Sequence, residues 1–200
     1  MTIAGQLMSG GLSPGHDLVF PACPENPDMR ESTSVWLYEE SGAFGFPRVG
    51  IEAEACRWDD RRVQGNFAMA GGRVLNAACT GAAHSPLGPD GRPTILGAGP
   101  LALRCITPFR KWRVSFAGTA IDGTGDQQIA GTLDPDKRTT VRLDGDLHMV
   151  TPAWVQDIPV EKVARMSAAD AIEAANMGIV WRFEHLFRAR GVFHVDGLSR

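Results

Sequence analysis

Residues 29–58 read MRESTSVWLYEESGAFGFPRVGIEAEACRW, and this stretch decides the fold. The first arm interleaves Val35 and Leu37 with Trp36 and Tyr38, so both of its faces carry large side chains. The second arm, residues 49–55, alternates apolar residues with glutamate, which is typical of a half-buried strand. A glycine-containing turn separates the arms. The stretch therefore predicts a β-hairpin.

After this hairpin, segments in which apolar and polar residues alternate follow one another along the chain. The clearest is residues 111–116, in which Lys, Arg and Ser alternate with Trp, Val and Phe. About ten short strands at a spacing of roughly 8–12 residues predict an all-β antiparallel barrel or sandwich. We expect an irregular lead-in over residues 1–28 and one β domain over residues 29–200.

Breaks between the strands are predicted from glycine, proline and aspartate. Residues 118–125 and Asp144-Gly145 are expected to form turns, and residues 126–133 a further strand. One short helix is expected at residues 167–178, with Ser167 as its N-cap and Gly178 after its last turn. The chain ends just after Asp196-Gly197, which predicts a hairpin whose return strand is missing. Such an open edge favours association with another chain or with a missing C-terminal half.

Composition excludes several classes of protein. The formal net charge is −3 and basic residues are not clustered, so we expect no nucleic-acid partner. No apolar run approaches the ~18 residues of a spanning helix, and the N-terminus lacks the pattern of a signal peptide. We therefore expect no stable membrane insertion and a cytoplasmic location. The four cysteines could form two disulfides, but Cys56, Cys79 and Cys105 lie in apolar runs and are expected to be buried free thiols.

Familiar catalytic and metal-binding motifs are missing from the sequence. There is no G-x-S-x-G elbow, no close histidine pair and no C-x-x-C pair, so we expect no metal and no cofactor. The pair His16-Asp17 in the lead-in is expected to anchor a loop by hydrogen bonding rather than to catalyse a reaction.

His185 is the most informative polar residue. It falls in phase with Trp181, Phe183 and Phe187 on an otherwise apolar face. One interpretation is a core histidine bonded to backbone, and the other is a polar group that orients a ligand or moves a proton in an apolar pocket. If the chain catalyses a reaction, His185 and Glu40 are the predicted proton donors. The predicted ligand-binding side chains are aromatic: Trp36, Tyr38, Trp112, Trp181 and Phe183.

Three segments resemble one known family. RESTSVWLYEESGAFGFPRVGIEA (30–53), GPLALRCITPFRKWRVSFAGTA (99–120) and WRFEHLFRARGVFHVDG (181–197) are similar to segments of the lipocalin-related superfamily of carotenoid 1,2-hydratases and AttH-like proteins. The resemblance implies a lipocalin-like barrel, the first half of a two-barrel protein, with an apolar cavity. It carries over no catalytic residue, because the acid proposed for the hydratases belongs to the later half.

These observations lead to two functional hypotheses. The first is a β-barrel that binds a hydrophobic small molecule, such as a terpenoid, steroid or aromatic lipid. Any reaction would be a hydration, dehydration or isomerisation without a cofactor. The second is a non-catalytic β-sandwich interaction module whose open edge pairs with another subunit, including a possible homodimer.

Overall fold

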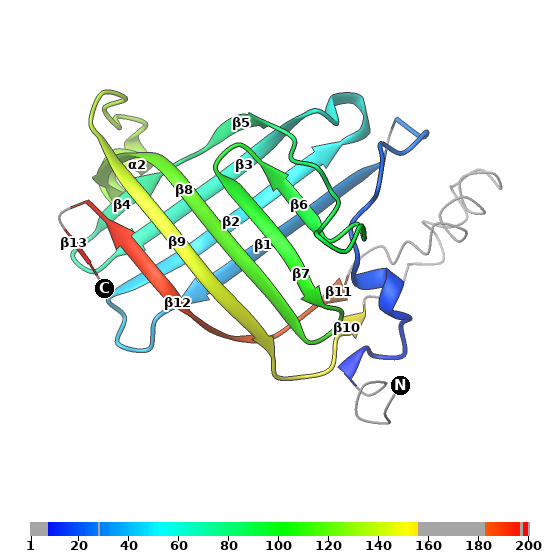
Figure 1. Ribbon diagram of the computed structural model, residues 1–200. Helices are drawn as coiled ribbons and strands as arrows, with labels where there is room; N and C mark the ends of the chain where they lie inside the picture. Colours follow the sequence, from blue (N-terminus) through cyan, green and yellow to red (C-terminus); the bar gives the residue numbers. More distant parts are fainter. Residues whose placement is uncertain (1–7, 28, 156–182, 197, 200) are drawn as a thin grey trace, which may run out of the picture.

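The computed structural model describes residues 8–27, 29–155, 183–196 and 198–199. Nearly all of its regular structure is antiparallel β-sheet, which confirms the predicted all-β class (Figure 1). The strands are β1 (Arg30–Tyr38), β2 (Phe44–Glu54), β3 (Asp60–Met69), β4 (Arg73–Asn76), β5 (Cys79–Ala82), β6 (Ile95–Ala98), β7 (Leu101–Thr107), β8 (Lys111–Thr124), β9 (Arg138–Met149), β10 (Trp154–Val155), β11 (Phe183–Glu184), β12 (Phe187–Val195) and β13 (Leu198–Ser199). The helical elements are the 3-10 turns η1 (Pro14–Asp17) and η2 (Ala55–Arg57) and the helix α2 (Gly125–Ala130).

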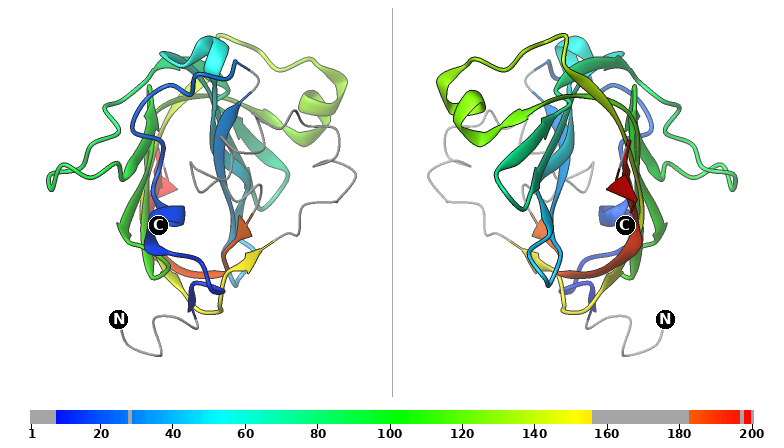
Figure 2. Two further views of the ribbon diagram at one scale, coloured as in Figure 1. Left: turned by 90° about the vertical axis from the view of Figure 1, so that its right-hand side faces the viewer. Right: turned by 90° about the vertical axis from the view of Figure 1, so that its left-hand side faces the viewer.

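Eleven of the described strands form one sheet that curls into a flattened barrel, seen end-on in Figure 2. Its main order is β1-β2-β3-β4-β8-β9-β12-β13, with β5 beside β3, β7 beside β8, and β6 beside β7. A separate two-stranded ladder joins β10 to β11. Among the described strands, β1 pairs with β2 alone and therefore lies at an edge of the sheet.

The hairpin predicted at residues 29–58 is confirmed as β1 and β2. Thr33 lies opposite Ile51, and Ser34 lies opposite Gly50. A Cβ at Gly50 would lie 2.6 Å from the Ser34 Cβ, so only glycine allows this close pairing. The register shifts where Pro47 enters β2, because proline supplies no N–H to a ladder.

Two predicted breaks are wrong, because β8 and β9 are continuous strands. Residues 118–124 extend β8 instead of forming a turn, and Asp144-Gly145 lies inside β9. The aspartates that suggested turns pair with arginines on neighbouring strands. The Arg73–Asp122 and Arg113–Asp144 ion pairs each have an N–O distance of 2.7 Å. Cross-strand charge pairs of this kind stabilise a ladder.

The strand predicted at residues 126–133 is also wrong, because α2 forms there. The Thr124 hydroxyl accepts from the Gln127 N–H, and the Gln127 side chain accepts from the Thr124 N–H, which completes a capping box. Gly131 ends the helix with φ 68°. The helix predicted at residues 167–178 lies outside the described residues.

A phenylalanine cluster fills the barrel interior between β2, β3, β8 and β12. Its members contact one another at centroid separations of 4.7 to 5.4 Å and are Phe44, Phe46, Phe67, Phe116 and Phe193. Aliphatic side chains from the inward faces of the strands continue this core, among them Val49, Val63, Leu103, Val114 and Val141. This part of the barrel is a packed core.

All four cysteines are free thiols. Cys105 lies on the inward face of β7 and is buried, as expected. The expectation that Cys56 and Cys79 are buried is wrong, because both are exposed. Cys56 lies in η2, where the alternation of a strand does not apply, and Cys79 begins the short strand β5.

Candidate functional site

A buried carboxyl group, that of Asp17, lies at one end of the barrel. Asp17 ends η1, which lies at the end of the barrel near β10 and β11 (Figure 1). Only 1% of Asp17 is exposed. Its Oδ2 atom accepts hydrogen bonds from the Phe109 N–H at 2.6 Å and from the Trp112 Nε1–H at 3.0 Å. The Cys105 thiol also donates to Oδ2, at 3.7 Å. These bonds confirm that Asp17 anchors the lead-in, as the sequence predicted.

The second carboxyl oxygen of Asp17 faces a histidine. Its Oδ1 atom lies 3.7 Å from Nε2 of His185, whose side chain is only 7% exposed. The His185 ring also contacts two aromatic rings, Phe109 at 5.7 Å and Phe187 at 5.2 Å between centroids. An ionisable pair therefore lies within an apolar enclosure. We call Asp17 and His185 the buried dyad.

The two residues of the dyad come from segments near opposite ends of the chain. His185 lies between β11 and β12, where the Leu186 carbonyl accepts a hydrogen bond of 2.9 Å from the Val150 N–H. Asp17 is brought in by the lead-in, where the Val19 N–H donates to the Pro93 carbonyl at 3.0 Å. A small apolar cluster covers this end of the barrel and contains Met8, Leu12, Phe109, Met149, Ala153 and Phe187.

Phe109 adds a strained backbone to the site. Its φ is 54°, in the left-handed region that bulky residues rarely adopt. Asp17 holds this conformation by accepting a hydrogen bond from the Phe109 N–H. Only 3% of Phe109 is exposed, and its ring lies beside His185. Residues in sparsely populated backbone regions gather at functional sites, because the surrounding structure must hold them there.

Burial perturbs both members of the dyad. It raises the pKa of Asp17 to about 6, although the donors Phe109, Trp112 and Cys105 lower it in part. Burial lowers the pKa of His185 to about 4. The order of the two pKa values means that a proton added to the dyad goes first to Asp17. Between about pH 4 and pH 6 the pair therefore consists of a carboxylic acid beside a neutral imidazole.

The predicted site residues separate into two groups. Trp112 is 8% exposed and donates to Asp17, so Trp112 and His185 both lie beside the same carboxyl group. Trp36 and Tyr38 are 76% and 85% exposed. Because their side chains point away from the core, the expectation that these two residues line the barrel interior is wrong.

The remaining predicted residues lie elsewhere. Glu40 is exposed in the β1–β2 turn, at the opposite end of the barrel from η1 (Figure 1). Glu40 and His185 therefore cannot act on one small molecule at one site. Phe183 pairs with Val155 in the β10–β11 ladder, and Trp181 lies outside the described residues.

Sequence reasoning missed Asp17 as part of the site. His185 and Asp17 are 168 positions apart in the chain, and no spacing rule joins a lead-in residue to a residue before the last long strand. The one signal in the sequence was an aspartate that directly precedes the short apolar stretch of Leu18, Val19 and Phe20. This pattern could not reveal which donors its carboxyl would meet.

A second buried ionisable cluster lies near the start of β1. Glu31 accepts a hydrogen bond of 3.0 Å from the Phe20 N–H, and burial raises its pKa to about 7. Arg61 is 3% exposed, donates to the Trp58 and Gly97 carbonyls, and lies 4.9 Å from the Trp58 ring centroid. Burial lowers the pKa of Arg61. These contacts join the lead-in to β1, β3 and β6.

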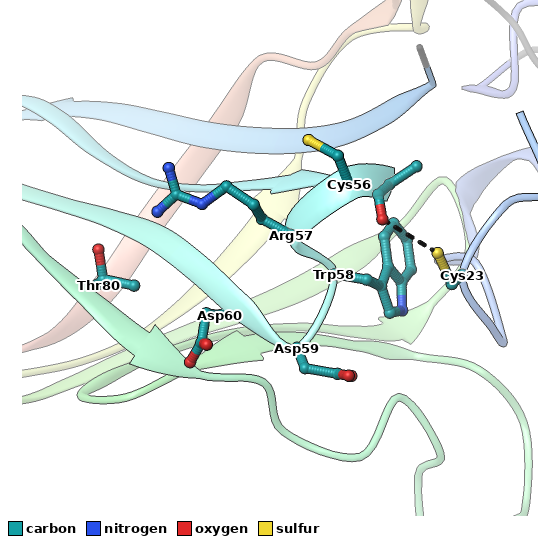
Figure 3. A pocket seen from close by; sticks show the side chains of 8 residues that line it. Cys23, Cys56, Arg57, Trp58, Asp59, Asp60 and Thr80 are labelled. Carbon is teal, nitrogen blue, oxygen red and sulfur yellow. Dashed lines mark hydrogen bonds between the residues drawn. The ribbon is translucent and has the colours of Figure 1, made fainter. Parts of the chain in front are cut away.

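An open groove of about 650 Å³ lies next to this cluster (Figure 3). Both charged and apolar side chains line it, including Cys23, Cys56, Trp58, Asp59 and Asp60. The Cys23 thiol donates to the Ala55 carbonyl at 3.4 Å. Of the described residues, neither Asp17 nor any predicted site residue lines this groove, so it is separate from the buried dyad.

Two further properties bear on the kind of site. The described residues contain no group of three or more His, Cys, Asp or Glu side chains that could hold a metal ion. Within the same residues, no helix has the length and apolar character needed to cross a membrane. Comparison of this chain with protein families, with curated proteins and with solved structures found no match.

Proposed function

We propose that this protein binds a hydrophobic small molecule at the barrel end that carries the buried dyad, and acts on it by acid–base chemistry without a cofactor. The observation that carries the proposal is the 3.7 Å approach of Asp17 Oδ1 to His185 Nε2 among the rings of Trp112, Phe109 and Phe187. Apolar surroundings with a few convergent polar groups are characteristic of small-molecule sites.

The choice of this end follows from the packing. The phenylalanine cluster fills the barrel interior between β2, β3, β8 and β12. A ligand of any size fits there only by displacing those rings. At the dyad, in contrast, a lead-in segment and a strand terminus meet, and such junctions rearrange at lower cost than a packed sheet interior.

The proposed reaction is hydration of an alkene, or its reverse. The Asp17 carboxylic acid transfers its proton to one alkene carbon, and a water molecule adds to the other carbon. The water loses a proton to the His185 imidazole, which returns it to Asp17. A pKa of about 6 leaves Asp17 partly protonated near neutral pH, which general-acid catalysis requires. Isomerisation uses the same groups, with the proton lost from a neighbouring carbon instead.

The resemblance to carotenoid 1,2-hydratases supports an isoprenoid as the substrate class. It rests on residues 30–53, 99–120 and 181–197, the second of which contains Cys105, Phe109 and Trp112. Asp17 is not within any of these segments. The acid proposed here is therefore a property of this chain's own structure.

Native mass spectrometry of the full chain purified from its own host tests binding. A co-purifying apolar molecule is expected, and Asp17→Asn or His185→Gln should lower its occupancy at least about tenfold. The matched controls are Asp196→Asn and His194→Gln, because His194 Nε2 and Asp196 Oδ1 are also 3.7 Å apart but are exposed. Failure of the wild-type chain to bind any apolar ligand or dye would refute the binding proposal.

Incubation of isoprenoid alkenes with the protein in heavy water tests the chemistry. Proton transfer from Asp17 would place one deuterium on a substrate carbon, and Asp17→Asn should abolish the incorporation. Binding without incorporation would reject the reaction but keep the ligand site.

A second candidate function is a non-catalytic module in which Asp17 is a latch. The three donors that converge on its Oδ2 atom favour this role, because they fix the lead-in to β7 and β8. A latch predicts that Asp17→Asn alters stability alone, with no bound molecule and no deuterium transfer in the wild type.

A further inference from the structure

Among the described strands β1 has one unpaired edge, and the backbone pattern of this free edge follows from the pairing of β1 with β2. The Met29 carbonyl accepts from the Ala55 N–H at 3.0 Å, and the Glu39 N–H donates to the Phe44 carbonyl at 3.1 Å. In an antiparallel ladder the bonding side alternates from residue to residue. The odd-numbered residues of β1 therefore bond to β2. The even-numbered residues direct their N–H and C=O groups toward the free edge.

The same even-numbered residues carry the exposed side chains of β1. They are Arg30, Ser32, Ser34, Trp36 and Tyr38, and they alternate with half-buried neighbours along the whole strand. The two aromatic rings are among the most exposed large apolar side chains of the described residues, at 76% and 85%. Free backbone groups and exposed rings thus lie along one strand.

Edge strands of soluble proteins usually carry devices that prevent pairing, such as lysine, proline or a bulge. β1 contains neither lysine nor proline, and its backbone is regular because the extra residue at the register shift belongs to β2. Nine residues is also long for an edge strand, given that natural edges are often kept short. Within the described residues, this edge therefore lacks these common barriers to pairing with another strand.

We propose that two copies of this chain pair through their β1 strands, antiparallel, about a two-fold axis at Ser34. Ser34 then faces Ser34 of the partner subunit, Ser32 faces Trp36 of the partner subunit, and Arg30 faces Tyr38 of the partner subunit. All five outward-directed residues meet residues with outward-directed backbone groups, so roughly ten hydrogen bonds join the subunits. The interface is isologous, as in most two-fold dimers.

The exposed side chains of β1 favour pairing with β1 of a second copy over pairing with an unrelated strand. Each bulky ring faces a small serine or a flexible arginine, never another ring, so the two faces fit without a clash. The Arg30 guanidinium reaches the partner's Tyr38 and, diagonally, the partner's Trp36, which places a cation over aromatic faces. Arg30 keeps its ion pair with Glu52, at 3.1 Å, on the side away from the axis. The inference does not depend on the proposed function.

Sedimentation velocity of the full chain over a micromolar to submillimolar dilution series tests the dimer. Wild type should dimerise, and Ser34→Pro should raise the dissociation constant at least about tenfold. The fold should survive this change, because the Ser34 N–H does not bond to β2 and proline is tolerated at a free edge. Ser34→Ala is the matched control and should dimerise like wild type.

Ser34→Lys is a second test that leaves the backbone intact. It places two lysines opposite each other on the two-fold axis, and it should abolish the dimer while the circular dichroism spectrum stays unchanged. A Ser34→Cys variant in a C23S/C56S/C79S background should form an inter-subunit disulfide under dissolved oxygen, whereas Ser32→Cys should not. A monomeric wild type, or a dimer that withstands both Ser34→Pro and Ser34→Lys, would overturn the proposal.

Discussion

At the scale of single residues, the main result is the opposite response of Asp17 and His185 to burial. Burial raises the pKa of the acid to about 6 and lowers that of the base to about 4. Each shift, from ordinary values of 3.8 and 6.5, is equivalent to about 3 kcal/mol of differential stability. Between about pH 4 and pH 6 both groups are neutral, because Asp17 keeps its proton and His185 has lost its own. An apolar enclosure accommodates such a neutral pair at a lower cost than two charges.

The dependence of the unfolding free energy on pH should distinguish the contribution of Asp17 from that of His185. Between pH 4 and 6, folded Asp17 holds a proton that the unfolded chain loses, so its stabilising contribution falls as the pH rises. Between pH 6.5 and 4, unfolded His185 takes up a proton that the folded form refuses, so its contribution falls as the pH drops. In wild type these opposing slopes largely cancel.

Single variants should therefore change the slope of unfolding free energy against pH in opposite directions. With Asp17→Asn, stability should decline as the pH falls from 6.5 to 4, by up to about 3 kcal/mol. With His185→Gln, it should decline as the pH rises from 4 to 6. Urea unfolding monitored by tryptophan fluorescence at several pH values measures both. Equal slopes in the two variants would contradict the pairing.

Cysteine reactivity gives a second prediction at this scale. Cys23, Cys56 and Cys79 are exposed, whereas Cys105 is buried and donates to Asp17. Burial also raises the pKa of the Cys105 thiol, which suppresses the reactive thiolate. A disulfide reagent should label three thiols in the native protein and the fourth only after unfolding. Rapid labelling of Cys105, located by peptide mass mapping, would show that this barrel end is open.

At the scale of elements, side-chain alternation predicted a strand correctly where one face of the strand is exposed to water. The prediction of strand ends was wrong where pairing with a neighbouring strand continues the strand. The alternation of residues 111–116 predicted the inward and outward faces of β8 correctly, with Trp112, Val114 and Phe116 buried. The aspartates of β8 and β9 suggested turns, but each meets a cation on a neighbouring strand. That partner comes from a distant segment, so local sequence could not supply it.

The helix α2 should depend on its N-cap. Thr124→Ala removes the hydroxyl that accepts from the Gln127 N–H, and should cost about 1 kcal/mol of unfolding free energy. Thr124→Ser keeps the hydroxyl and should cost little. Denaturant titration of both variants measures the difference. Equal losses in the two would assign the effect to the side-chain methyl group instead of the cap.

At the scale of the whole molecule, the phenylalanine cluster joins strands that are far apart in the sheet order. Phe193 on β12 contacts Phe44 and Phe46 on β2 and Phe67 on β3, at centroid separations of 4.7 to 5.4 Å. No ladder links β12 to β2 or β3 among the described strands, so side chains alone close this part of the barrel.

Removal of the Phe193 ring should lower the unfolding free energy strongly. Phe193→Ala is expected to lower the unfolding free energy by about 3–5 kcal/mol, because it leaves a cavity in a packed interior. Val192→Ala, at a 60% exposed neighbour, is the control and should change stability by less than about 1 kcal/mol. Thermal unfolding of both variants tests the difference, and similar losses would mean that the cluster does not close the barrel.

The sequence by itself determined the all-β class, the opening hairpin and most inward-facing residues, because the side-chain alternation of a strand is a local property of the backbone. It also named His185 and Trp112 as site residues, and both lie beside Asp17, while their role in binding stays a prediction. Only the tertiary structure brought Asp17 to His185, directed Trp36 and Tyr38 outward and exposed Cys56 and Cys79. Those outcomes depend on how a curled sheet places distant segments side by side, and no residue pattern along the chain encodes that geometry directly.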